Sequence, residues 1–270
     1  MEISERSIFN LIIFPSIILL HFSNNVLILR NKSLHKTIYY LLVNLSVSDI
    51  MLCVTVFLTN LNLHHNIYLE ISYATCYTAS VISTVAITVD RYVAVVHCLH
   101  YRDIATKRRM LVAIVLIWTL SLLLSVLPSI ITQDHAYRLF VRDCIHCPVY
   151  LMCSVFLVCS SLLIQYVRNK HVVAIKKRKV YFGIEDERLG ILQNLKLAVM
   201  EVIRLNFVTA LLVFVGNILD VVDKYYWKGA NVPLFVATIV FKASYMMSNP
   251  IVYILTMTEL KVQYRKIFSC

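Results

Sequence analysis

Charged residues, glycine and proline are all scarce in this 270-residue chain. Asp, Glu, Lys and Arg make up only 15% of it, there are 4 Gly and 5 Pro, and 59% of the residues are hydrophobic. The mean hydropathy is +0.74. A soluble domain of this composition would have too little polar material to cover its surface. The composition therefore excludes an ordinary soluble domain and predicts that lipid is the solvent for much of the chain.

Seven continuous apolar runs account for most of the hydrophobic residues. About 20 apolar residues are enough for a helix to span the hydrocarbon core of a bilayer. The runs do not alternate in polarity as the strands of a membrane barrel would. We therefore predict an all-α fold, a seven-transmembrane helix bundle that forms one domain over residues 1–270. The predicted helices are 8–30, 38–62, 68–97, 110–131, 148–168, 197–220 and 232–257.

The basic residues mark one side of the membrane. Eighteen of the 26 Lys and Arg fall in alternate loops and the C-terminal tail, against five in the other set of loops. Because loops rich in Lys and Arg stay on the cytoplasmic side, the N-terminus is predicted outside and the C-terminus in the cytoplasm of a multi-pass plasma-membrane protein. The net charge of +11 is then a signal of topology and gives little support to nucleic-acid binding.

Two short motifs lie near the ends of the third and seventh predicted helices. The first is Asp90-Arg91-Tyr92 and the second is Asn249-Pro250-Ile251-Val252-Tyr253. An arginine at membrane depth normally faces a partner or a water-filled cavity, and Asp90 is the adjacent partner. In this order and at these places, the two motifs resemble those of rhodopsin-like (class A) G-protein-coupled receptors.

The resemblance implies a receptor, not an enzyme, that transmits the binding of an extracellular ligand to a heterotrimeric G protein. On activation, Arg91 would separate from Asp90 and meet Tyr166 and the G protein. The residues that the resemblance assigns to coupling and activation are Asp90, Arg91, Tyr92, Tyr166, Asn249, Pro250 and Tyr253. The loop 98–109 is also similar to the equivalent loop of odorant receptors.

An aspartate lies within the second predicted helix, at mid-membrane depth. A carboxylate there is costly and marks a functional site by default. The resemblance implies that Asp49 binds a sodium ion together with Ser80 and Asn249, and oxygen ligands suit a hard cation. A protonated, hydrogen-bonded Asp49 is the alternative. No other cofactor is expected. Retinal is not expected, because Lys242 lies one residue from the position of the lysine that carries retinal in opsins. A shift of one residue along a helix turns a side chain by about 100°.

The predicted ligand cavity lies at the outer ends of the third and seventh helices. Tyr73 occupies the position where amine receptors carry an aspartate, which argues against an amine ligand. Its predicted lining is Tyr73, Tyr77, Lys242 and Tyr245. These residues suggest a small, mostly apolar ligand. Lys242 either contacts an anionic group or extends toward water, and Glu70 is its nearest candidate counter-ion.

The chain also departs from the family pattern. Asn66 stands where the family has a cysteine that is bonded to the second outer loop, and Leu211 and Val213 replace the tryptophan and proline of the sixth helix. These losses make a decoy receptor that does not signal the main alternative. An opsin-like photoreceptor and a transporter are lesser ones, since no internal repeat is visible.

The remaining cysteines leave several possibilities open. Cys144 and Cys147 could bond each other, remain free, or hold a metal with His146, although two cysteines and one histidine are weak evidence for a metal site. The segment 258–270 is predicted to form a short amphipathic helix at the membrane surface. Its last residue, Cys270, is either palmitoylated or a free thiol.

Overall fold

The computed structural model of the chain is built from helices. It describes residues 2–30, 37–60, 66–96, 101–132, 134–182, 208, 211–212, 214–219, 222 and 232–256. No strand occurs in that part of the chain, which confirms the all-α prediction. The helices are α1 (Glu2–Arg30), α2 (Thr37–Asn60), α3 (Ile67–Val96), α4 (Tyr101–Ile104), α5 (Lys107–Ile131), α6 (His135–Phe182) and α8 (Val232–Thr256).

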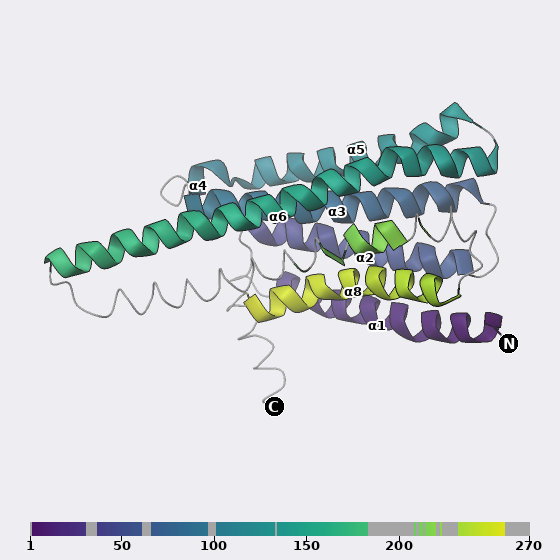
Figure 1. Ribbon diagram of the computed structural model, residues 1–270, viewed down its shortest axis with the longest axis horizontal. Helices are drawn as coiled ribbons and strands as arrows, with labels where there is room; N and C mark the ends of the chain where they lie inside the picture. The colour runs from purple at the N-terminus through teal and green to yellow at the C-terminus, as the bar shows by residue number, and fades with distance from the viewer. Residues whose placement is uncertain are drawn as a thin grey trace.

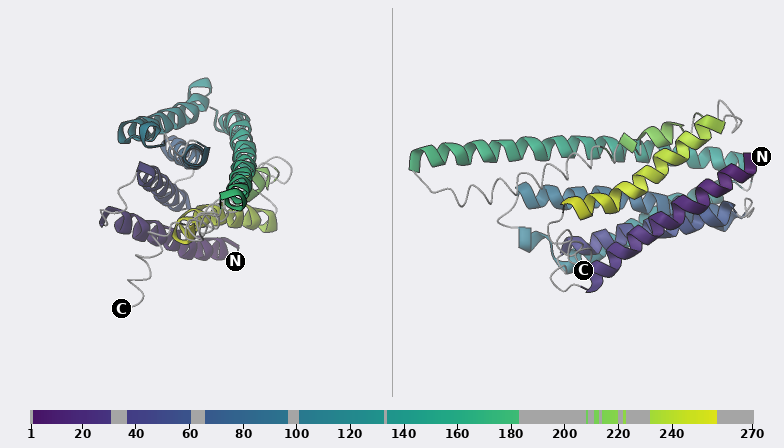
Figure 2. Two further views of the ribbon diagram at one scale, coloured as in Figure 1. Left: turned by 90° about the vertical axis from the view of Figure 1, so that its left-hand side faces the viewer. Right: turned by 90° about the horizontal axis from the view of Figure 1, so that it is seen from below.

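The long helices lie side by side along one axis, with α3 at the centre of the bundle (Figure 1). The central helix packs against α2, α5 and α6, and α1 packs against α2 and α8. Figure 2 shows the bundle from its end and from below, with α1 and α8 adjacent and α6 projecting beyond the other helices. This arrangement places α3 in contact with elements from both halves of the chain.

Among the described residues, five helices contain apolar stretches long enough to cross a membrane, at Ile13–Arg30, Ile38–Thr59, Ile67–Ala94, Lys107–Ile131 and Phe140–Val167. Only 17% of the stretch in α5 is buried inside the protein, and large apolar side chains such as Leu123 and Ile130 are 68% and 74% exposed. Lipid is the solvent that can accommodate such a surface. The bounds of α1, α2, α3, α5 and α8 agree with the predicted helices to within a few residues, apart from the earlier start of α1.

The prediction for the fifth helix is wrong in length. It was placed at 148–168, but α6 runs from His135 to Phe182 and includes segments predicted as loops on both sides. Residues 149–182 contain neither glycine nor proline, and the next glycine is at 183. Nothing therefore interrupts the helix after the apolar run ends, and Pro148 lies inside it, as membrane helices tolerate.

Two predicted segments fall largely or wholly outside the described residues. The sixth predicted helix is described only at 208, 211–212 and 214–219, all of which are helical, and 222 just beyond its end is helical as well. The predicted amphipathic helix at 258–270, including Cys270, lies outside the described residues.

The buried interior is divided into two apolar clusters with polar side chains between them. One cluster includes Ile17 and Leu52, and the other includes Leu27 and Leu45. Asp49 lies between the two clusters along α2 and is fully buried. The fold therefore surrounds a polar layer with apolar packing above and below it.

Asn44 joins three helices on one side of this layer. Its Nδ2 donates to the Ser83 hydroxyl of α3 at 2.9 Å, and its Oδ1 accepts from Trp118 Nε1 of α5 at 2.8 Å. Hydrogen bonds between membrane helices are worth about 0.6 kcal/mol on average and about 1.7 kcal/mol at most. Asn44 is thus a connection of moderate strength between α2, α3 and α5.

Asn44→Leu is expected to destabilise the protein by about 1–3 kcal/mol, because it removes two hydrogen bonds and leaves the Trp118 N–H without its acceptor. The measurement is thermal unfolding of the purified protein. Trp118→Phe removes one of the two bonds and should cost less. In a double-mutant cycle, a coupling near zero between the two substitutions would contradict the prediction.

Candidate functional site

The polar layer is organised around Asp49, whose side chain is 0% exposed. The Ser80 hydroxyl donates to its Oδ1 at 2.5 Å, and Asn249 Nδ2 donates to its Oδ2 at 3.1 Å. The structure therefore brings together Asp49, Ser80 and Asn249 from α2, α3 and α8. A further group, His21 Nε2 of α1, lies 3.5 Å from the same Oδ2.

The proline of the second motif explains the position of His21. Pro250 has no backbone N–H, so the carbonyl of Met246, four residues earlier, lacks its helical partner. His21 Nε2 lies 3.2 Å from that carbonyl oxygen, and His21 is 1% exposed. One turn further along α1, Asn24 Nδ2 donates to the Pro250 carbonyl at 3.4 Å. Side chains of α1 thus bind the backbone of α8 around the proline.

Tyr245 links the polar layer to the half of the bundle that contains the N-terminal half of α3. Its hydroxyl lies 2.9 Å from the Ser80 hydroxyl and 3.3 Å from that of Thr84. Its ring meets the ring of Tyr77 edge-on, with centroids 6.4 Å apart. Tyr245 was predicted in the ligand cavity; the structure places its hydroxyl in the layer around Asp49 and only its ring toward Tyr77.

A cluster of tyrosines lies between Tyr245 and the N-terminal end of α3. Tyr73 and Tyr77 stack with centroids 6.2 Å apart, and Tyr150 of α6 packs edge-on against Tyr77 at 4.9 Å. The Tyr77 hydroxyl donates to Asn217 Oδ1 at 3.3 Å. The Tyr150 hydroxyl lies 3.1 Å from His146 Nδ1. The structure thus joins the predicted pair Tyr73 and Tyr77 to Tyr150 and Asn217, which the sequence did not single out, and through Tyr150 to His146, which the sequence suggested only as a metal ligand.

The opposite end of α3 carries the first motif. Arg91 donates to Asp90 Oδ2 from Nε at 3.1 Å and from a terminal nitrogen at 2.5 Å. The Tyr101 hydroxyl donates to Asp90 Oδ1 at 2.9 Å and accepts from Arg91 at 3.3 Å. Burial, followed by the charge of Asp90, raises the pKa of Tyr101 to about 12, so the phenol keeps its proton and can donate. The Asp90 and Arg91 side chains are thus paired with each other and bridged by Tyr101.

The other predicted residues are placed less centrally. Tyr166 is 65% exposed on α6, and Tyr92 is half-buried. The side chains of Lys242 and Tyr253 lie outside the part of the structure that is described. Their assigned roles therefore stay predictions from the sequence.

An ion pair joins α3 to α6 at the N-terminal ends of these helices. Arg138 Nε lies 3.2 Å from Glu70 Oε2, with the two side chains 9% and 15% exposed. Glu70, the candidate counter-ion of Lys242, thus pairs with Arg138. Cys144 is a free, exposed thiol, so it is not bonded to Cys147. The described residues contain no cluster of metal-binding side chains.

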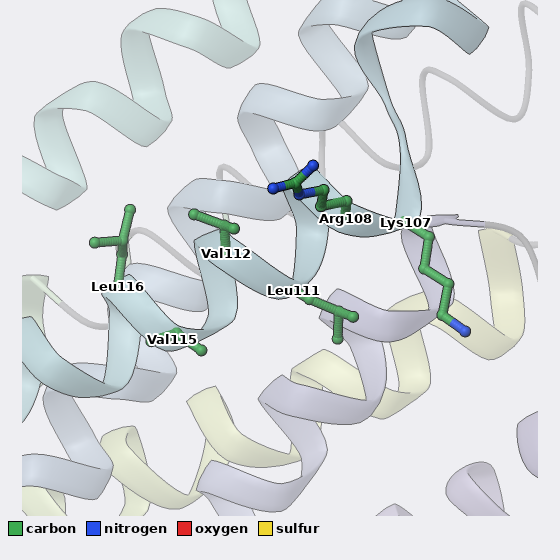
Figure 3. Close-up of a pocket in the computed structure, with 6 residues that line it drawn as sticks. All are labelled: Lys107, Arg108, Leu111, Val112, Val115 and Leu116. Carbon is green, nitrogen blue, oxygen red and sulfur yellow. The ribbon is translucent and has the colours of Figure 1, made fainter.

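A surface groove runs along the outward face of α5 (Figure 3). Its walls are Leu111, Val112, Val115 and Leu116, and two cationic side chains from the first turn of the helix stand at one end. One of these cations, Lys107 Nζ, lies 5.6 Å from the centre of the Tyr40 ring. Apolar side chains at lipid depth followed by cations at headgroup depth are typical of a membrane surface.

Comparison with known proteins identifies the fold family. A family model described as "7 transmembrane receptor (rhodopsin family)" matches residues 25–253. The chain belongs to this family. The match confirms the seven-helix bundle and a multi-pass protein of the plasma membrane. Because the family consists of receptors, it also confirms that the chain is not an enzyme.

Several curated relatives of this receptor are adrenergic receptors. The chain is 34% identical to the alpha-1A adrenergic receptor of Oryzias latipes over 119 residues, which is 38% of this chain and 25% of the relative. It is 31% identical to the human alpha-1A receptor over 132 residues, 43% of this chain and 28% of the relative. Identity to the human alpha-1D adrenergic receptor is 26% over 206 residues, 66% of this chain and 34% of the relative. The matched segments thus span about a quarter to a third of these relatives.

Sequence reasoning missed His21 and Tyr101 as site residues. Pro250 carried a signal for the first, because the carbonyl that it releases requires a donor from another helix. The signal for Tyr101 was weaker, since only its position shortly after the Asp90 motif distinguishes it from other loop tyrosines. Neither residue has a periodic pattern that would mark it.

Proposed function

We propose that this receptor transmits the binding of a small extracellular ligand to a heterotrimeric G protein. The observation that best supports this proposal is that Asp90, Arg91 and Tyr101 are hydrogen-bonded to one another at one end of α3, while the tyrosine cluster lies toward the other end. In the proposed mechanism, Arg91 leaves Asp90 when the bundle rearranges and becomes available to the G protein. Tyr166 is the predicted partner of the released guanidinium.

The contacts provide a continuous route between the two ends. Tyr77 packs on Tyr245, whose hydroxyl meets the Ser80 hydroxyl, which in turn donates to Asp49. A ligand that moves Tyr77 would therefore alter the polar layer through direct contacts. Its effect is limited to the difference between its affinities for the two arrangements of the bundle.

For the ligand itself we propose a small, mostly apolar molecule without an amine. The acid on the outermost turns of α3, Glu70, is already paired with Arg138, and Tyr73 presents a phenol one turn below it. An ammonium group would thus find no available carboxylate on these turns of α3. In this respect the receptor would differ from its adrenergic relatives. Lys242 remains a proposed contact for an anionic group of the ligand.

We place the N-terminus outside and the C-terminus in the cytoplasm, with residues 1–270 as one receptor domain. The excess of basic residues near Arg91 and in the loops on its side of the bundle supports this orientation. It puts the Asp90 motif where a cytoplasmic G protein can reach it, and the tyrosine cluster toward the outside.

The test is nucleotide exchange on a panel of purified G proteins, with the receptor reconstituted in lipid nanodiscs. Exchange above the rate with receptor-free nanodiscs would support coupling and identify the G protein. The rival is a decoy that binds ligand without signalling, favoured by Leu211 and Val213 in place of the family's tryptophan and proline. Ligand binding without exchange, in protein that unfolds cooperatively, would support the decoy and overturn the proposal.

A further inference from the structure

The tautomer of His21 follows from the partners of its Nε2. Both are acceptors: the Met246 carbonyl at 3.2 Å and the Asp49 carboxylate at 3.5 Å. A carbonyl oxygen cannot donate, so Nε2 is the nitrogen that carries the hydrogen. Nδ1 has no hydrogen-bond partner within the described part of the chain. His21 therefore donates its N–H to the Met246 carbonyl, and this bond holds the imidazole with Nε2 3.5 Å from Asp49 Oδ2.

Asp49 is consequently surrounded by donors that belong to the protein. Its Oδ1 accepts from Ser80, and its Oδ2 accepts from Asn249 and faces the N–H of His21. A bound cation needs oxygen lone pairs directed at it and no positive hydrogen in its place. Beside Oδ2 the space is occupied by the imidazole ring of His21, whose protonated Nε2 lies 3.5 Å away.

The residues present therefore do not fit the sodium ion that the family resemblance implies. To admit the ion, His21 would have to turn away, which would leave the carbonyl released by Pro250 without its donor. The Tyr245 hydroxyl also occupies the space beside Ser80 Oγ, at 2.9 Å. His21 and Tyr245 are each 1% exposed. Tyr245 belongs to the apolar cluster that includes Ile17 and Leu52.

We propose that the His21 imidazole takes the place of a bound cation beside Asp49, so that this receptor stabilises its polar layer with its own side chain and is insensitive to sodium. The inference rests on the geometry of the layer and not on G-protein coupling. It can therefore be tested by stability alone, and its failure would leave the proposed function untouched.

The experiment compares melting temperatures of the purified full chain in sodium chloride, potassium chloride and choline chloride at equal ionic strength. The wild type is expected to melt at the same temperature in all three salts. His21→Gln keeps an N–H at a similar reach and should behave like the wild type. His21→Ala and His21→Ser remove the donor and open space, and should melt about 3 °C higher in sodium than in potassium, at sodium about ten times its Kd.

Asp49→Asn serves as the control, because a neutral amide cannot hold the ion. Added to His21→Ala or His21→Ser, it should abolish the sodium-specific rise. Sodium-specific stabilisation of the wild type that Asp49→Asn removes would overturn the proposal. Sodium insensitivity of the folded His21→Ala or His21→Ser variant would equally overturn it, since His21 would then not be what excludes the ion. The wild-type comparison keeps the test decisive even if one variant fails to fold.

Discussion

Arg91→Ala is expected to reduce nucleotide exchange on the cognate G protein to the receptor-free rate, whereas Asp90→Asn should raise ligand-independent exchange about tenfold. Two neighbouring substitutions on α3 would thus act in opposite directions. The first removes the group that is proposed to meet the G protein. Asp90→Asn leaves the Arg91 guanidinium in place and weakens the hydrogen bonds that hold it.

The size of the second effect follows from the contacts of Asp90. Its carboxylate accepts two hydrogen bonds from Arg91 and further bonds from Tyr101. Hydrogen bonds to charged groups contribute about 1.5–3 kcal/mol, and the 29% exposure of the Arg91 side chain favours the lower end of that range. Asparagine keeps the shape and an acceptor but loses the charge. A shift of about 1.4 kcal/mol toward the released arrangement is tenfold in its population.

Tyr101→Phe provides a graded control for this pair. It removes one donor to Asp90 and one acceptor for Arg91 while leaving both charges, so exchange should rise by about threefold at most. All variants are measured at equal amounts of folded receptor. Exchange by Asp90→Asn at or below the wild-type rate would show that the ion pair does not restrain activation. Full exchange by Arg91→Ala would remove Arg91 from the mechanism.

The fold was largely predictable because one physical signal, the length of an apolar run, determines where a membrane helix begins and ends. α2, α3, α5 and α8 follow their runs closely. The signal failed for α6, whose ends lie outside the apolar run, because a helix continues wherever no residue breaks it and its polar groups can reach water. From Arg168 onward the absence of glycine and proline was the better indicator, and it extends to Phe182.

The site was predictable only in part, because a single chain shows which polar residues are costly but not which others satisfy them. Asp49 stood out by its charge, and family resemblance supplied Ser80 and Asn249. His21 is one histidine in an apolar helix, and its role depends on a carbonyl 225 residues away in the chain. Contacts of that kind are set by how the helices pack, which apolar periodicity does not specify in a helix such as α1, whose exposed face is also apolar.

Loss of the Glu70 and Arg138 ion pair is expected to be the most destabilising single change outside the polar layer. The pair connects the first turn of α3 to the first turn of α6, in the region where the family resemblance implies a disulfide and this chain has Asn66. Both side chains are largely buried, at 9% and 15% exposure. Removing one partner of a buried pair leaves the other charge uncompensated, which costs about 3–5 kcal/mol.

Arg138→Ala should therefore lower the melting temperature of the purified receptor by about 6 °C or more. Arg142→Ala is the matched control, because Arg142 pairs at 3.4 Å with the adjacent Asp143 of the same helix and its pair does not connect two helices. Replacing both partners, Glu70→Leu with Arg138→Met, should recover much of the loss, since an apolar pair of similar volume carries no buried charge. Equal effects of Arg138→Ala and Arg142→Ala would contradict the assignment. Recovery by the double variant would show that the penalty is the unpaired charge, and that α3 and α6 can be held together at this end without any covalent bond.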